Sequence, residues 1–409
     1  MPKGFYFLIL AQFASGLADN AFMILGVYFL HEQGYPGWWA PLLKFSFTLS
    51  YVVLASVAGP VADAFAKSRL MAAMNLLKLM GVFLLVTGAH PLLAFALTGL
   101  AAALYAPAKY GLVSESVPTK LLVKANAWLE VSVVLSVMLG VALGGGLIHW
   151  QLHQADDLWV DHQATVGGWS ATQIVDAFAV VISIYGFSAL LNLGVSPMNS
   201  TRRQPWSWRD IQWTLFWSQN RRLWADPMGG MSLHVTTLCW GVGAVLQFAV
   251  LTWAQTNAGL TLQQGAFMQA IVAFGVIGGA AMAAYRCRIF NARRALPWGL
   301  VLAALLPAMA LIYSLPVAVI LLFIAGWSGG MLLVPMNALL QHRGVNLMHS
   351  GRSIAVQGFN ENLSVLVMLG IYSVMVAWEI PLLHIMLLAT VPLLFAVVPW
   401  LRRSQKRWA

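Results

Sequence analysis

The sequence predicts an all-α integral membrane protein with twelve transmembrane helices. Of its 409 residues, 60% are apolar and 9% are charged, and the mean hydropathy of +0.76 excludes a soluble domain of this length. Twelve apolar runs follow one another along the chain. Each run has the roughly 20 residues needed to cross a hydrocarbon core about 30 Å thick. The expected spans are residues 5–30, 41–62, 70–88, 92–113, 125–148, 173–196, 228–252, 263–286, 295–313, 317–340, 353–377 and 382–401.

The basic residues indicate the orientation of these spans. Twenty of the 23 Lys and Arg residues fall at the termini or in every second gap between spans, and the intervening gaps hold none. Cytoplasmic loops retain positive charge whereas translocated loops avoid it, so both termini are predicted to lie in the cytoplasm. The net charge of +10 is therefore attributed to membrane topology rather than to a nucleic-acid partner.

The first span is expected to be a retained helix rather than a cleaved signal peptide. Its apolar run begins at Phe5 and continues past Asp19 and Asn20 without a good cleavage site. The two cysteines, Cys239 and Cys287, have neither metal-binding nor redox spacing, so we expect them to be small packing residues. No metal ion and no cofactor are predicted.

A cytoplasmic linker, residues 197–227, is predicted to divide the chain. It joins an N-terminal six-helix half, 1–196, to a C-terminal six-helix half with a basic tail, 228–409. The linker interleaves five tryptophans with arginines. This pattern favours a helix lying in the headgroup layer, where its arginines reach anionic membrane lipids.

An internal repeat relates the two halves. The stretch from Pro107 to Gly140 matches the stretch from Pro335 to Gly370, with an offset of 228 to 231 residues. Spans four and five therefore match spans ten and eleven, and the intervening spans give both pairs the same orientation. Two parallel, pseudo-symmetric six-helix halves joined by a cytoplasmic linker are the architecture of the major facilitator fold, with a substrate path between the halves.

The loop after the second span resembles a motif of that superfamily, Gly-x-x-x-Asp-x-x-Gly-Arg-Lys. It contains Gly59, Asp63, Lys67 and Arg69, with Ala66 near the place of the motif's second glycine. A carboxylate at the end of span two can meet the positive N-terminal end of span eleven. We therefore predict that these four residues form a conformational latch at the inner gate rather than a substrate contact.

Ionisable residues inside the spans are the candidates for function, because a charge at the bilayer centre costs about 2.5–3.5 kcal/mol. Lys44 is close enough to the external interface to extend toward water, and Lys78 lies in a span expected to pack outside the cavity. Asp19 and Lys109 lie in cavity-lining spans, where they either contact substrate or form a buried ion pair with each other. Glu130 and Glu361 are also ionisable residues inside the spans, and the repeat relates their positions. For both, a gating role and a substrate role are equally open.

Many short motifs, in constant order from span one to span twelve, resemble the bacterial lysophospholipid transporter family. They include Ala11-Gln-Phe with Asp19-Asn20, Tyr105-x-Pro-Ala-Lys-Tyr-Gly111, Val334-Pro-x-Asn-Ala-Leu-Leu-Gln341 and Ile354-Ala-Val-Gln-x-x-x-Glu361-Asn. The resemblance implies an inner-membrane transporter that moves lysophosphatidylethanolamine and lysophosphatidylglycerol from the outer to the inner leaflet. It also implies a separate acyltransferase/acyl-acyl-carrier-protein synthetase that re-acylates them. We expect the protein to be a monomer.

The chain departs from the family pattern in the seventh span. This span contains Trp240 and Gln247, and the family has an arginine at the position of Gln247. Arginine offers a phosphate a charged bidentate fork, whereas glutamine offers neutral hydrogen bonds only. Either Lys109 carries more of the phosphate binding here, or the headgroup preference differs.

The predicted mechanism is alternating access with a lateral opening for the acyl chain. Lys109 is expected to bind the phosphate, and Asp19 with Asn20 to bind the ammonium or glycerol group. The substrate-binding set also includes Lys78, Trp240 and Gln247. The residues expected to gate or line the cavity are Asn126, Glu130, Gln357, Asn360 and Glu361.

Two alternatives belong to other functional classes. A proton-coupled exporter of amphipathic drugs or other small molecules would use Asp19 as its titrating group, and its flux would depend on an imposed pH gradient. A membrane-embedded acyltransferase or hydrolase would need a His-x4-Asp pattern or a Gly-x-Ser-x-Gly nucleophile elbow. We expect neither, so no enzymatic activity is predicted.

Overall fold

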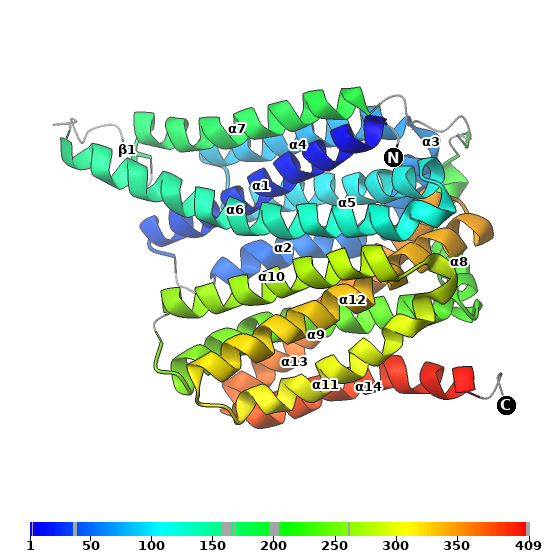
Figure 1. Ribbon diagram of the computed structural model, residues 1–409. Helices are drawn as coiled ribbons and strands as arrows, with labels where there is room; N and C mark the ends of the chain where they lie inside the picture. Colours follow the sequence, from blue (N-terminus) through cyan, green and yellow to red (C-terminus); the bar gives the residue numbers. More distant parts are fainter. Residues whose placement is uncertain are drawn as a thin grey trace. The chain divides into compact units, whose positions relative to one another are not determined.

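The computed structural model of the protein is nearly all helical (Figure 1). It describes residues 1, 3–35, 39–157, 165–166, 169–195, 204–205, 207–260 and 262–405. Parts of the predicted linker (197–203 and Trp206) and the last four residues of the basic tail lie outside the described residues. Within the described part, two short strands, β1 (Thr165–Val166) and β2 (Trp169–Ser170), pair antiparallel.

The α-helices follow the order of the expected spans. They are α1 (Lys3–Glu32), α2 (Trp39–Val53), α3 (Ala55–Ala64), α4 (Lys67–Val86), α5 (Pro91–Ser116), α6 (Leu122–Asp157), α7 (Ala171–Gly194), α8 (Trp213–Ala225), α9 (Gly229–Thr256), α10 (Leu262–Arg286), α11 (Leu296–Ala310), α12 (Leu315–Leu347), α13 (Ser350–Ala377) and α14 (Leu382–Gln405). Short 3₁₀ helices are η1 (Thr119–Leu121), η3 (Trp208–Ile211) and η4 (Ile289–Ala295).

The number of membrane spans agrees with the sequence. Eleven helices of the described chain are long and apolar enough to cross a membrane, and the pair Pro41–Val53 with Ala55–Ala64 makes twelve when counted as one bent span. This pair is the predicted second span, 41–62, and it bends by 64° at Leu54. The predicted twelve-helix fold is confirmed, and the protein is a multi-pass membrane protein.

The described residues form two compact units by their internal contacts. Unit 1 comprises Met1–Leu112 and Leu135–Gln212, and unit 2 comprises Val113–Val134 and Trp213–Ala409. Unit 2 therefore includes the end of α5 and the beginning of α6 in addition to α8 through α14. The predicted division into 1–196, 197–227 and 228–409 stays a prediction.

Aromatic packing fixes the helices of unit 1. Phe22 of α1 stacks on Phe95 of α5 with ring centroids 4.3 Å apart, and it meets Phe178 of α7 edge-on at 6.3 Å. All three rings are buried. Lipid tails are as apolar as these side chains, so van der Waals packing rather than the hydrophobic effect holds such helices together in a bilayer. The packing positions α1 beside helices that carry its polar partners.

In unit 2, α10 and α12 cross at a stripe of glycines. Gly275 and Gly279 of α10 face Gly326 and Gly330 of α12, and each pair is spaced by four residues. A Cβ atom on Gly279 would collide with the backbone carbonyl of Trp327. The two backbones are therefore in direct contact, as in other membrane helix pairs with small residues four apart.

The same stripe corrects one sequence expectation. Residues 326–330 read Gly-Trp-Ser-Gly-Gly and so match the letters of the Gly-x-Ser-x-Gly pattern, which was expected to be absent. A nucleophile elbow places its serine at an exposed strand-to-helix turn. Ser328 instead lies inside α12, fully buried, and its hydroxyl donates to the carbonyl of Ile324 at 2.8 Å. The pattern is a packing motif here, not a nucleophile.

Candidate functional site

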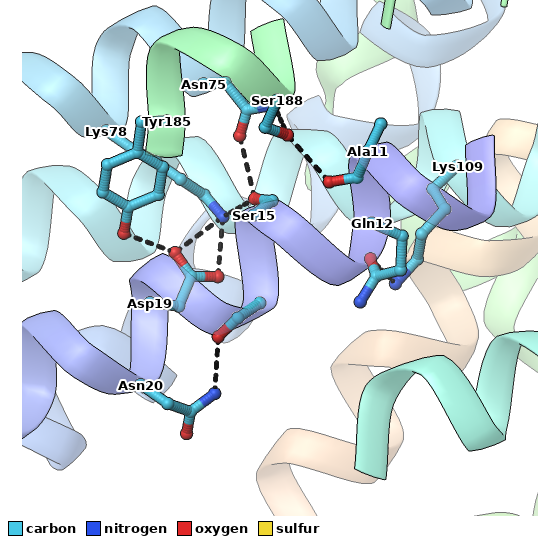
Figure 2. A network of polar contacts seen from close by, with 11 residues as sticks. Ala11, Gln12, Ser15, Asp19, Asn20, Asn75, Lys78, Lys109, Tyr185 and Ser188 are labelled. Carbon is cyan, nitrogen blue, oxygen red and sulfur yellow. Dashed lines mark hydrogen bonds and ion pairs between the residues drawn. The ribbon is translucent and has the colours of Figure 1, made fainter. Parts of the chain in front are cut away.

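Two polar stripes run along α1. Residues four apart lie on one face of a helix, so Ser15 and Asp19 share one face while Gln12, Gly16 and Asn20 share the next. The first stripe contacts α4 and α7, and the second contacts α5 and α6 (Figure 2). The sequence signal for both stripes is this spacing of four.

Asp19 accepts three hydrogen bonds from two neighbouring helices. The ammonium of Lys78 on α4 lies 2.7 Å from Oδ2 and 2.9 Å from Oδ1, and the hydroxyl of Tyr185 on α7 donates to Oδ1 at 2.7 Å (Figure 2). Lys78 is 2% exposed and Asp19 is 21% exposed. The Lys78 ammonium also lies 5.3 Å from the ring centroid of Tyr105. The charge of Asp19 is thus compensated within unit 1.

The ion pair continues into a relay of hydrogen bonds that was not predicted. Lys78 Nζ donates to Ser15 Oγ at 3.0 Å, and Ser15 Oγ donates to Asn75 Oδ1 at 2.8 Å. Asn75 Nδ2 donates to Ser188 Oγ at 2.8 Å, and Ser188 Oγ returns to the carbonyl of Ala11 at 2.7 Å. A buried network whose members are paired rigidifies its surroundings, so this relay ties α1, α4 and α7 together.

Lys109 of α5 lies against the second stripe. Its ammonium donates to Gln12 Oε1 at 2.7 Å and lies 4.3 Å from the ring centroid of Tyr110. Its side chain is buried. The alternative of an ion pair between Asp19 and Lys109 is therefore wrong, because the partner of Asp19 is Lys78.

Asn20 lies where α6 approaches α1 closely. Its Nδ2 donates to the carbonyl of Gly16 at 2.8 Å. A Cβ atom on Gly140 of α6 would come within 2.7 Å of the Asn20 Cβ, and one on Gly16 would collide with Ser136 Oγ. Small residues on both helices thus allow α6 to pack closely against the face of α1 that carries Asn20.

Glu361 of α13 has neutral hydrogen-bond partners in unit 2. Gln357 Nε2 donates to Glu361 Oε1 at 2.8 Å and to Asn337 Oδ1 of α12 at 2.9 Å. Thr236 of α9 lies near Glu361, and its hydroxyl donates to the carbonyl of Leu233 at 3.3 Å. No Lys or Arg among the described residues pairs with Glu361. Glu130 of α6 is near enough to repel it electrostatically, so unit 2 brings the two repeat-related carboxylates together.

Asn126 forms a reciprocal amide pair. Its Nδ2 donates to Gln341 Oε1 at 2.9 Å, and Gln341 Nε2 donates to Asn126 Oδ1 at 2.8 Å. Both side chains are buried. Each amide satisfies the other, so the pair joins the beginning of α6 to α12 within unit 2.

Asn360 contacts the linker helix α8. Its Nδ2 donates to Asn220 Oδ1 at 2.9 Å, and its Oδ1 accepts from Trp224 Nε1 at 3.2 Å. The preceding Phe359 meets Phe216 of α8 edge-on with ring centroids 5.2 Å apart. These contacts hold α8 on α13, which the sequence did not predict for Asn360.

The α9 candidates lie on the surface of unit 2. Trp240 and Gln247 are both exposed and are seven residues, or about two turns, apart. The backbone carbonyl of Gln247 accepts a hydrogen bond from Gln269 Nε2 of α10 at 2.9 Å. Their spacing places the two side chains on one face of α9.

The predicted latch loop makes its turn without the motif's second glycine. Phe65 has φ −100° and ψ 159°, and Ala66 has φ −62° and ψ 112°, so both are extended and no left-handed residue is required. Gly59, Asp63 and Lys67 are buried, whereas Arg69 is exposed. The carbonyl of Asp63 accepts the backbone N–H of Gln204 at 3.1 Å. The role of these residues as a latch stays a prediction.

Asp226, between α8 and α9, is a structural residue that the sequence analysis missed. It forms a bidentate pair with Arg343 of α12, with Nε at 3.0 Å and Nη2 at 2.5 Å. It also accepts the backbone N–H of Gly229, the first residue of α9, at 2.7 Å. The hydrogen bond from Arg343 holds the pKa of Asp226 below its usual value.

The comparison with protein families agrees with this architecture. The family model described as Major Facilitator Superfamily matches residues 8–368. A protein of Yersinia enterocolitica named lysophospholipid transporter LplT is 35% identical over 385 residues, covering 94% of this chain and 90% of the relative. The chain belongs to the lysophospholipid transporter family of the major facilitator superfamily. It is a transporter and not an enzyme.

A second relative and two solved structures agree with this family and fold. LplT of Yersinia pestis strain Pestoides F is 35% identical over 380 residues, covering 92% of this chain and 88% of the relative. Among solved structures, the major facilitator transporter FucP in an outward conformation superposes with a TM-score of 0.75 over 97% of this chain and 98% of that chain, at 14% identity. The human organic anion transporter MFSD10 gives a TM-score of 0.72 over 98% and 100%, also at 14% identity. These structures show the fold alone.

Proposed function

We propose that this protein moves lysophosphatidylethanolamine and lysophosphatidylglycerol from the outer to the inner leaflet of a bacterial inner membrane. The observation that carries the proposal is the 35% identity to LplT proteins over more than nine-tenths of the chain. Transport proceeds by alternating access, with the headgroup in a polar site and the acyl chain in a lateral opening. A separate acyltransferase then re-acylates the lipid.

Lys109 is the residue we assign to the lipid phosphate. It is a buried cation whose ammonium is oriented by the neutral amide of Gln12 at 2.7 Å. The lysine ammonium is a compact point charge with three rotatable N–H donors, and this suits it to bind a phosphate. Asn20 lies two helical turns from Gln12 on the same stripe of α1 and supplies a neutral polar contact for the headgroup. Asp19, which is held by Lys78 and Tyr185, positions α1.

The remaining parts of the proposal concern the inner side of the membrane. The latch at the inner gate includes Asp63, Lys67 and Arg69. These residues control the change between the conformational states of the transporter. The α8 helix exposes Trp213, Trp217 and arginines at its surface, which suits contact with anionic headgroups.

The test is flux in proteoliposomes that contain the purified protein. Labelled lysophosphatidylethanolamine is added to the outer leaflet, and albumin extraction separates the lipid that has crossed from the lipid that has not. We expect time-dependent protection from albumin that empty liposomes lack. Lys109→Ala should lower the flux at least tenfold, since removing a charged contact costs about 1.5–3 kcal/mol.

Lys109→Arg is the matched control because it keeps the charge while changing its shape. It should retain part of the flux, and both variants should elute as the wild type does in size-exclusion chromatography. Flux of lysophospholipid equal to that of empty liposomes would refute the proposed function. Flux of amphipathic drugs that follows an imposed pH gradient would favour the exporter instead.

A further inference from the structure

We propose that the loop between α10 and α11 binds the headgroup of an anionic phospholipid that stays in the cytoplasmic leaflet of the membrane. The binding site, called the η4 surface here, consists of Tyr285, Arg286, Arg288, Phe290 and Arg294. All five residues belong to unit 2. The surface is separate from α8 and from the residues that we assign to the transported lipid, so this inference goes beyond the proposed function and does not rest on it.

The positive charge of this loop is not balanced by the protein. Between Asp226 and Glu361 the sequence contains no acidic residue, whereas residues 286–294 contain four arginines. Among the described residues, no carboxylate pairs with any of these four. The partner of Arg293 is a sulfur atom, because its Nη2 donates to Sδ of Met228 at 2.9 Å, and a thioether is a weak, neutral acceptor. The loop therefore carries a charge that an anion can neutralise.

Two aromatic side chains beside these charges have most of their surface uncovered. Tyr285, the last residue but one of α10, is 86% exposed, and Phe290 of η4 is 81% exposed. Aromatic residues at the ends of membrane helices lie at the level of the lipid headgroups. A basic loop that only determines the orientation of the protein needs no such residues. Exposed rings next to unpaired arginines instead favour contact with the membrane surface.

The η4 helix holds these side chains on a fixed platform. Its buried residues are Ile289, Ala292 and Ala295, each at most 2% exposed. Residues three apart lie above one another in a 3₁₀ helix, so this spacing turns one edge of η4 into the protein and the other edges outward. The side-chain oxygen of Asn291 accepts the backbone N–H of Arg288 at 2.7 Å and fixes the first turn. A surface that is ordered before binding loses less entropy when a ligand arrives.

The end of α14 adds a basic residue to the same end of unit 2. The hydroxyl of Thr390 on α14 donates to the carbonyl of Ala303 on α11 at 3.2 Å, and a Cβ atom on Gly299 would come within 2.5 Å of Val397. The two helices are therefore antiparallel neighbours, and α14 ends beside the start of α11 (Figure 1). The exposed Arg402 thus lies at the end of α14 that is near η4.

An anionic phosphodiester is the ligand that fits these features. A guanidinium binds phosphate oxygens through two parallel N–H donors and is only weakly hydrated. Basic clusters at the cytoplasmic ends of membrane helices bind anionic headgroups. Phosphatidylethanolamine also has a phosphate, but its ammonium cancels the charge of the headgroup and is repelled by the arginines. The η4 surface should therefore prefer phosphatidylglycerol and cardiolipin, which share an anionic phosphodiester without an ammonium.

Native mass spectrometry of the detergent-purified protein tests this preference. The probes are phosphatidylglycerol, cardiolipin and phosphatidylethanolamine, each added at the same concentration. We expect the fraction of protein that retains phosphatidylglycerol or cardiolipin to be at least fivefold larger than the fraction that retains phosphatidylethanolamine. Equal retention of all three lipids would contradict the η4 surface.

A pair of double variants locates the charge that matters. Arg288→Gln with Arg294→Gln removes two exposed charges of the η4 surface and should lower the retention of phosphatidylglycerol at least fivefold. Lys120→Gln with Lys124→Gln is the matched control, because it removes two exposed charges from another basic segment of the same unit. The control should change the retention less than twofold. An equal loss in both double variants would show that only the total positive charge matters, and it would overturn the site.

Photo-crosslinking locates the bound lipid in the wild-type protein. A phosphatidylglycerol probe that carries a diazirine at the start of one acyl chain is added to liposomes containing the protein, and mass spectrometry measures the labelling of the peptide that contains η4. This labelling should be at least fivefold stronger than that by the corresponding phosphatidylethanolamine probe. Tyr285→Ala with Phe290→Ala keeps every arginine and should lower the labelling at least threefold, because the rings that contact the lipid are gone.

The outcomes distinguish this inference from the proposed function. Labelling of α8 instead of η4 would place the anionic lipid on the linker helix and overturn the η4 surface. If the double arginine variant fails to fold, the crosslinking of the wild-type protein decides the question. A wild-type protein that moves no lysophospholipid refutes the proposed function and leaves the result on lipid binding unchanged.

Discussion

Asp19 in unit 1 and Glu361 in unit 2 are both carboxylates within membrane-spanning helices, yet their hydrogen-bond and ion-pair partners differ. Asp19 pairs with a buried lysine and a tyrosine, and this pair opens into a relay that ends on the backbone of α1. Glu361 is held by the neutral amide of Gln357 and lies near another carboxylate. Among the described residues, Asp19 has a cationic partner and Glu361 has none. We therefore expect the first charge to serve structure and the second to serve transport.

The largest expected effect comes from breaking the pair in unit 1. Lys78→Met leaves Asp19 without its cation and should destabilise the folded protein by about 3–5 kcal/mol, as for other buried ion pairs that lose one partner. Thermal unfolding in detergent, followed by tryptophan fluorescence, measures the loss. The double variant Asp19→Asn with Lys78→Met removes both charges and should recover most of the stability. Purely additive losses would contradict a coupled pair.

The second prediction concerns an ion pair outside the membrane, Asp226 with Arg343. The pKa of Asp226 is lowered chiefly by the hydrogen bond from Arg343, so its contribution to stability is present above the unfolded pKa of about 3.9. The contribution is lost as the pH falls through the lower, folded-state pKa. Asp226→Asn should cost about 1.5 kcal/mol at pH 7. Unfolding curves of the wild type and the variant should converge as the pH falls through the folded-state pKa of Asp226. A constant difference at every pH would show that the charge is not involved.

The smallest effect on stability is expected at Glu361. Glu361→Gln removes a charge that has no cationic partner in the described chain, so no ion is left unpaired. Its free energy of unfolding should change by less than about 1 kcal/mol, in contrast to Lys78→Met. The same unfolding assay measures both variants. A loss as large as that of Lys78→Met would show that Glu361 is structural and would remove the contrast between the units.

The fold was predictable because membrane spans leave a strong signal. Length, apolarity and the alternation of basic residues gave twelve spans, and the bent second span is the element whose shape they missed. No proline or glycine stands at Leu54, where the break lies, so the local sequence gives no signal for it. The glycine stripe of α10 and α12 is visible in the sequence as two pairs spaced by four, although its partner helix is not.

The site was predictable in its residue types but not in its pairings. The cost of intramembrane charge pointed to Asp19, Lys78, Lys109 and Glu361. Which lysine meets Asp19 depends on how α1, α4 and α5 rotate about their axes, and one sequence does not determine this. Neutral partners such as Ser15, Asn75 and Tyr185 carry no charge that marks them in the sequence. Their contacts with the charged residues are therefore evident only in the structure.

The backbone contact between α10 and α12 has a mechanical consequence. Most helix pairs meet through side chains that can change rotamer and so allow the helices to tilt or slide. Where Gly275 and Gly279 press on Gly326 and Gly330, no such compliant layer exists, and separating the helices would expose two bare backbones to lipid. We therefore expect these two helices to move together as one rigid body. A lipid tail that leaves the protein sideways must pass through a different seam.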